Sequence, residues 1–154
     1  ECFNDLIKKD NKINLLIIGE GEELLSLKNI IKKYDIQKNI LLIGFKENVF
    51  KYLYKCKAFI LASLWEDPGF VLLEAMYCNT IVLSSDCHSG PKEILDKKRG
   101  LLFKSNSKED FIKNFNTFNK LDKDEKYKIK YDAKKFTKNF SLLNHYKKLE
   151  TLLS

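Results

Sequence analysis

The sequence has little of what builds membrane spans or disulfide frameworks. It contains six glycines, two prolines, one tryptophan and a single arginine among 28 basic residues. No run of eighteen apolar residues occurs, so no segment is predicted to span a membrane. The four cysteines lie far apart and form no CxxC pair, which argues against a disulfide or zinc framework. We therefore predict reduced thiols in a cytoplasmic protein, with Cys56 and Cys78 buried.

The first fourteen residues lack the apolar segment and cleavage site of a secretory signal. The chain also has no initiator methionine, and we expect it to be a piece of a longer protein.

The charge balance narrows the classes of partner. The 28 basic and 21 acidic residues give a net charge of +7. This excess indicates either solvated lysine-rich helix faces or attraction to an anionic membrane surface or phosphorylated substrates. Nucleic acid is not favoured, because lysine dominates over arginine and no helix-turn-helix, RRM or zinc-finger pattern occurs.

The order of apolar segments predicts an α/β fold. Short apolar runs, continuous rather than alternating, are separated by helical patterns, which is typical of a Rossmann-like parallel sheet with helices on both faces. We predict one domain over residues 1–154, with an α/β core to about residue 104 and terminal helices over 105–154. The predicted strands are residues 15–18, 40–43, 59–61, 81–83 and 101–103. The predicted helices of the core are residues 22–34, 49–54, 70–78 and 91–95. Apolar stripes in the terminal helices are Phe111, Phe115 and Phe118, and then Leu142, Tyr146, Leu149 and Leu152.

The stretch SLWEDPGFVLLEA, residues 63–75, is the strongest functional signal. It follows a predicted strand and contains a Pro-Gly turn, then the start of a helix at Phe70 and Val71. A helix N-terminus with Gly69 before it suits phosphate, because N–H groups and the positive end of the helix dipole point outward. Glu66 and Glu74 suit sugar hydroxyls, because ionised carboxylates accept hydrogen bonds. Together these features predict a nucleotide-sugar site.

Two further loops carry weaker signals. Gly19 and Gly21 follow the first predicted strand, but the third glycine of a GxGxxG fingerprint is replaced by Leu24, so a nicotinamide or flavin site is not favoured. A tight turn and a ligand-facing backbone both remain open for these glycines. Asp86, Cys87 and His88 are consecutive, and consecutive loop residues seldom converge on one atom, so a metal or nucleophile site is not favoured there. We expect that loop to line the same sheet edge through its backbone.

Six ordered blocks, from LLIIGEG through NILLIGF, AFILASLWEDPGFVLLEAM, TIVLSSD and GPKEIL to GLLF, resemble the C-terminal half of family-4 glycosyltransferases of the GT-B fold. The resemblance runs from about residue 14 to residue 103, and the Asp-Pro version is similar to bacterial enzymes that build capsule, O-antigen, lipopolysaccharide and other surface polysaccharides. It implies retaining transfer of a sugar from a nucleotide-diphosphate-sugar donor to a saccharide or lipid-linked acceptor, without a metal or other cofactor.

The resemblance also implies roles for particular residues. The two glutamates of the family's EX7E motif fall on Glu66, near the reacting centre, and on Glu74, at the ribose hydroxyls. The backbone at Gly69, Phe70 and Val71 would meet the diphosphate and sugar. The resemblance further implies that the base lies near Phe45 and Lys46, and that Gly19 and Gly21 border the same cleft.

The sequence departs from the family pattern in two ways. Asp67-Pro68-Gly69-Phe70 replaces the usual Gly-Phe-Gly, although Gly69 is kept. An upstream strand with an Arg-Lys pair that grips the diphosphate, and the N-terminal acceptor domain, have no counterpart in the sequence. We therefore expect this chain by itself to bind nucleotide weakly and to transfer sugar poorly. The alternatives are a non-catalytic nucleotide-sugar-binding or interaction module, a GT-B epimerase, for which suitable acid and histidine groups are lacking, and a flavodoxin-like domain, which leaves Glu74 unexplained.

Overall fold

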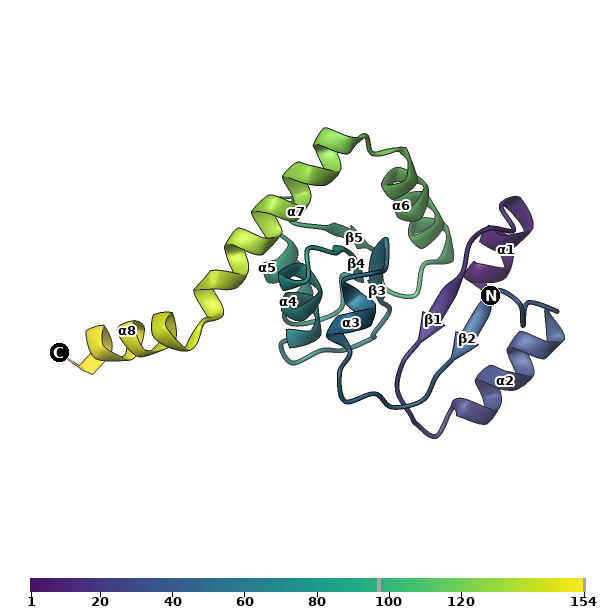
Figure 1. Cartoon of the computed structure of the whole chain (residues 1–154), viewed down its shortest axis with the longest axis horizontal. Coiled ribbons are helices and arrows are strands. Elements are labelled where there is room, and N and C mark those ends of the chain that lie inside the picture. Colours follow the sequence, from purple (N-terminus) through teal and green to yellow (C-terminus); the bar gives the residue numbers. More distant parts are fainter. Residues whose placement is uncertain (97, 154) are drawn as a thin grey trace. The chain divides into compact units, whose positions relative to one another are not determined.

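The computed structural model describes residues 1–96 and 98–153 (Figure 1). The chain divides into two compact units, Glu1–Val49 and Phe50–Ser154. Each unit is an α/β arrangement with its own parallel sheet. The predicted parallel strands and the Rossmann-like α/β class are confirmed, and the strands pair within two sheets, one in each unit.

The first unit alternates helix and strand. Its elements are α1 (Cys2–Lys9), β1 (Leu15–Ile17), α2 (Leu24–Lys33) and β2 (Ile40–Leu42). Strands β1 and β2 are parallel, with Leu15 opposite Ile40. The buried centre is Ile7, Ile31 and Ile36, with partly buried apolar side chains packed around it. Each helix contributes to this centre the apolar residues that its sequence spacing places on one face.

The second unit is built on three parallel strands. In chain order its first elements are α3 (Phe50–Leu53), β3 (Ala58–Leu61), α4 (Phe70–Tyr77), β4 (Ile81–Ser85), α5 (Pro91–Leu95) and β5 (Leu101–Phe103). Strand β4 lies between β3 and β5 and is buried along its whole length, as a continuous apolar run predicts. The loops that follow β3 and β4 therefore leave the same edge of the sheet, because all three strands run in one direction.

Helices complete the second unit. They are α6 (Lys108–Lys120), α7 (Lys123–Thr137), a short 3-10 helix η1 (Lys138–Phe140) and α8 (Leu142–Leu153). The predicted stripe of α6 is confirmed, since Phe111, Phe115 and Phe118 are buried and the Phe111 ring meets Phe103 edge-on with centroids 5.2 Å apart. In contrast, the α8 stripe is exposed, as Leu142 shows at 85%.

The single arginine is a structural residue that connects α5 to α7. Arg99 is only 8% exposed, and its guanidinium donates to the carbonyls of Ile94 and Glu93, each at 2.8 Å. The guanidinium carbon lies 3.8 Å from the centre of the Phe136 ring on α7. Satisfied donors and a stacked planar face make this buried charge tolerable.

The prediction that Cys56 is buried is wrong, whereas the prediction for Cys78 is confirmed. Cys56 lies in the turn after α3 and is exposed as a residue, although its thiol donates to the Leu53 carbonyl at 3.3 Å. Cys78 ends α4 against the sheet. Loss of solvent around the sulfur raises the pKa of both thiols above its ordinary value.

Candidate functional site

The N-terminus of α4 is open to a ligand. Gly69 immediately precedes the helix in the left-handed conformation, with φ +81° and ψ 50°, which a glycine adopts without strain. Within the described part of the chain, no side chain caps this helix end. The N–H groups of Phe70 and Val71, on the first turn, are therefore left to an external acceptor, and the helix dipole favours an anion.

The two predicted glutamates flank this helix start. The side chain of Glu66 turns toward Gly69, so that a Cβ atom placed on Gly69 would lie 3.5 Å from the Glu66 Oε2 atom. Glu74 follows Phe70 by four residues, and the two side chains therefore share one face of α4. Glu74 is half-buried while its neighbours Leu73 and Ala75 are buried, so this face is the one turned from the core.

The loop after β4 lies directly against the loop after β3. Trp65 and His88 form an isolated parallel bridge between the two loops. The Ser85 hydroxyl donates to the Ser63 carbonyl at 2.6 Å, fastening the end of β4 to the start of the first loop. As predicted, the loop after the fourth strand adjoins the residue 63–75 segment at the carboxyl edge of the sheet. Ligands of open α/β sheets bind at such an edge.

Gly90 is where the two loops approach most closely. A Cβ atom at this position would lie 2.6 Å from the Pro68 carbonyl carbon and closer still to the carbonyl oxygen. The peptide bond before Pro68 is cis, and Gly90 has φ +84° and ψ −67°. A side chain at Gly90 would therefore push apart the loops that carry Glu66 and His88.

Apolar and aromatic side chains surround the glutamates. Trp65 is 65% exposed and Phe70 is 59% exposed. Large exposed rings beside carboxylates suit a polyol ring or a base, because each has an apolar face and a hydroxyl or amide edge. Among the described residues, no three His, Cys, Asp or Glu side chains gather as metal ligands would.

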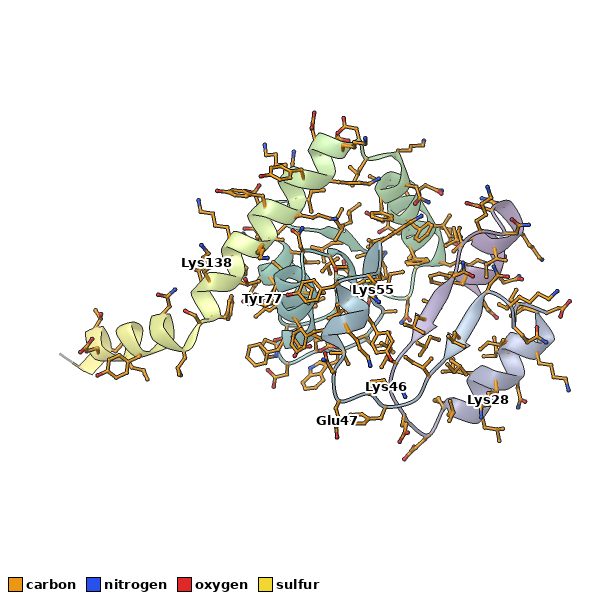
Figure 2. The ribbon with its side chains drawn as sticks, viewed as in Figure 1. Lys28, Lys46, Glu47, Lys55, Tyr77 and Lys138 are labelled. Atoms are coloured by element: carbon orange, nitrogen blue, oxygen red, sulfur yellow. The ribbon has the colours of Figure 1, made fainter. Side chains whose placement is uncertain are left out.

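The first unit brings its own predicted residues together at the ends of β1 and β2. The Gly19 N–H donates to the Gly44 carbonyl at 3.0 Å, and the Glu20 carboxylate accepts from the Phe45 N–H at 3.4 Å. The Phe45 side chain is exposed, and Lys46, labelled in Figure 2, is half-buried in the same loop. Gly21 lies at the start of the turn into α2, where its carbonyl accepts from Leu24 at 3.1 Å.

Three residues of these loops were missed by the sequence reasoning. Glu20, Ser85 and Gly90 each hold one loop against another and touch a part of the chain distant in sequence. Gly90 has a local signal, since it directly precedes Pro91 at the start of α5. Glu20 and Ser85 have none, because their partners follow only from the folded arrangement.

Comparison with known proteins gives a consistent family. The family described as "Glycosyl transferases group 1" matches residues 1–136. The chain is 36% identical over 133 residues to a Campylobacter jejuni protein, N-acetylgalactosamine-N,N'-diacetylbacillosaminyl-diphospho-undecaprenol 4-alpha-N-acetylgalactosaminyltransferase, covering 82% of the chain and 36% of the relative. It is 38% identical over 93 residues to an uncharacterized glycosyltransferase of Methanocaldococcus jannaschii, covering 60% of the chain and 23% of the relative.

Solved structures share the fold. TarM of S. aureus, solved with Fondaparinux, alpha-GlcNAc-glycerol and UDP, superposes with a TM-score of 0.86 at 23% identity, over 98% of this chain and 31% of that protein. Anabaena HepE in complex with UDP gives a TM-score of 0.86 at 17% identity, over 99% of this chain and 44% of that protein. The chain thus spans well under half the length of the proteins it matches. The predicted GT-B type of Rossmann-like fold is confirmed.

Proposed function

The chain belongs to the group 1 glycosyl transferases, and from this membership we propose that it forms the donor-binding half of a retaining glycosyltransferase. The donor is a nucleotide-diphosphate-sugar. The observation that carries this proposal is the uncapped start of α4, with Glu66 turned toward Gly69 and Glu74 on the same helix face as Phe70. Anion-binding N–H groups and hydroxyl-binding carboxylates on one short segment fit a ligand that is both phosphate and polyol.

The proposal gives each residue of α4 and its preceding loop a role. The diphosphate lies at the N–H groups of Phe70 and Val71, where negative charge builds up as the nucleoside diphosphate departs. Glu66 contacts the donor sugar near the reacting carbon, and Glu74 accepts hydrogen bonds from the ribose hydroxyls. Fixed donors at the developing charge are the largest contribution to such catalysis, and the loss of one costs about 3–4 kcal/mol of barrier. This mechanism needs no metal ion.

The first unit has a separate part in the proposal. The base of the nucleotide packs near Phe45 and Lys46, and the backbone of Gly19 and Gly21 borders the ligand. The hydrogen bonds of Gly19 to Gly44, and of Glu20 to Phe45, support this by holding the two loops in fixed positions within the unit. Substitution of Phe45 tests this part independently of the glutamates.

The relatives indicate the class of acceptor. One acts, by its name, on a diphospho-undecaprenol-linked sugar, and another is a poly(ribitol-phosphate) alpha-N-acetylglucosaminyltransferase of Staphylococcus aureus. We propose a saccharide or lipid-linked acceptor in the synthesis of a surface polysaccharide, with the reaction in the cytoplasm. The acceptor would be held by an N-terminal domain, so the 154-residue chain alone should bind a nucleotide without transferring sugar at a useful rate.

Titration with UDP and GDP tests the proposal. The fluorescence of Trp65, the single tryptophan, reports directly on the loop beside Glu66. Glu74→Ala should weaken the binding of the preferred nucleotide about 10- to 100-fold, because charged hydrogen bonds contribute roughly 1.5–3 kcal/mol. Glu150→Ala is the matched control, since it removes one exposed carboxylate from α8. A wild-type chain that binds neither nucleotide, or equal affinities for both variants, would contradict the proposal.

A further inference from the structure

A hollow of about 430 Å³ lies where α7 passes the C-terminal end of α4. It is formed within the second unit and is distant in sequence from Glu66 and Gly69. Its lining is aromatic and basic and consists of Asn79, Tyr127, Tyr131, Lys134, Lys135 and Lys138.

The lining residues form one face of α7. Steps of three and four residues from Tyr127 through Tyr131 and Lys134 to Lys138 keep these side chains on one side of a helix. The opposite side is used by the fold, since Ala133 is buried and Phe136 stacks on the buried arginine. The Tyr127–Lys138 face is therefore the solvent side of α7.

The positive charge of this face is concentrated and not neutralised by acids. No carboxylate is among the residues that line the hollow, within the part of the chain that the structure describes. The Lys134 ammonium instead lies 5.6 Å from the centre of the Tyr77 ring, which belongs to α4 (Figure 2 labels Tyr77 and Lys138). A ring face attracts the cation and leaves its charge available to an external anion.

We propose that this face of α7 docks on the surface of an anionic phospholipid bilayer. From Tyr127 to Lys138 the row extends about 16 Å along the helix axis. That length matches several headgroups in a plane rather than one soluble phosphate. Tyr127 is 70% exposed, and tyrosine rings with a wet hydroxyl and an apolar body are enriched at bilayer interfaces. Lysines beside them meet the negative surface potential.

The arrangement of the tyrosines favours a bilayer over a nucleic acid. The rings of Tyr127 and Tyr131 are stacked on each other, with centroids 6.3 Å apart and planes 23° apart. One face of each ring is thus covered by the other ring, whereas nucleic-acid bases need free ring faces on which to stack. The hydroxyl edges remain outside, where headgroups would meet them.

Vesicle co-sedimentation tests the docking surface. Wild-type chain is mixed at low and high salt with vesicles of phosphatidylcholine alone or mixed with phosphatidylglycerol. We expect salt-sensitive binding to the anionic vesicles only. The triple change Lys134→Gln, Lys135→Gln and Lys138→Gln should weaken this binding about a hundredfold, since each lysine near such a surface contributes about fivefold. Tyr127→Ala should weaken it several-fold with the charge intact.

The matched control removes three lysines elsewhere. Lys28, Lys32 and Lys38 are exposed in the first unit, and their change to glutamine lowers the net charge by the same amount, from +7 to +4. This control should still bind. No binding of the wild type, or equal losses in both triple variants, would overturn the docking surface. So would lysine-dependent binding to a single-stranded oligonucleotide in place of vesicles. Nucleotide titration through Trp65 should be unchanged in both triple variants, so failure of the donor-site proposal is seen separately.

Discussion

Replacement of Gly90 by alanine tests whether the loops after β3 and β4 are packed as one rigid surface. The Cβ atom introduced by this change would overlap the Pro68 carbonyl, which is backbone and has no rotamer through which to yield. Gly69→Ala is the matched comparison, because it introduces the same methyl group five residues into the same pair of loops. At Gly69 the new Cβ would meet only ordinary contacts, at 3.5 Å from Glu66 and Leu72 atoms.

The expected magnitudes differ clearly. Gly69 has left-handed φ and ψ values, for which a non-glycine residue costs about 1–2 kcal/mol. Gly90 lies outside that region, with ψ −67°, where strain amounts to about 1–3 kcal/mol before any overlap is counted. Overpacking adds roughly another 1–3 kcal/mol. We therefore expect a loss in the free energy of unfolding of about 1 kcal/mol for Gly69→Ala and about 4 kcal/mol for Gly90→Ala.

Urea unfolding followed by Trp65 fluorescence measures this difference. Trp65 lies in the first loop and is bridged to His88 in the second, so its signal reports the second unit. Far-UV circular dichroism of the same samples follows both units, and separate transitions would show that the two units unfold independently. If the two alanine variants had equal midpoints and slopes, the close approach of Gly90 to Pro68 would not exist as described.

Three further substitutions or reactions probe the second unit. Arg99→Lys should cost about 2–3 kcal/mol of unfolding free energy, because lysine cannot donate to both carbonyls and stack on Phe136 at once; a change in urea midpoint near zero would contradict this. Ser85→Ala should cost about 1 kcal/mol by removing the 2.6 Å bond to the neighbouring loop, and Ser85→Thr should show whether the hydroxyl restores it. The thiols of Cys56 and Cys78 have raised pKa values, so less thiolate is present at a given pH, and iodoacetamide should label them several-fold more slowly in the folded chain than in urea. Their labelling rates should continue to rise above pH 9, and equal rates in the folded and unfolded chain would refute the assignment.

Much of the second unit was predictable because its signals are local. The apolar run that became β4, the Pro-Gly turn before α4 and the Pro at the start of α5 each act within a few residues. The spacing of Phe111, Phe115 and Phe118 likewise determines which face of α6 is buried. Such patterns require no knowledge of distant parts of the chain.

What could not be predicted depends on contacts between distant segments. Cys56 was expected to be buried as an apolar residue, but the end of α3 turns it outward, and only its thiol finds a backbone partner. The bond from Ser85 to Ser63 joins residues 22 apart, and no periodicity indicates it. The basic tyrosine face of α7 was visible only as a lysine-rich segment, until the packing of α7 on α4 showed which side faces solvent.

The burial of β4 has a consequence for the time scale of motion at the candidate site. Strand β4 is paired on both sides and is buried at every residue from Ile81 to Ser85. Amide protons in such a strand exchange with solvent only through the rarest, most extensive openings of the unit. Since Ser85 ends this strand and binds the loop that carries Glu66, the loop is anchored to the slowest-exchanging part of the unit. A ligand would thus meet a glutamate loop already in place, and little ordering entropy would be lost on binding.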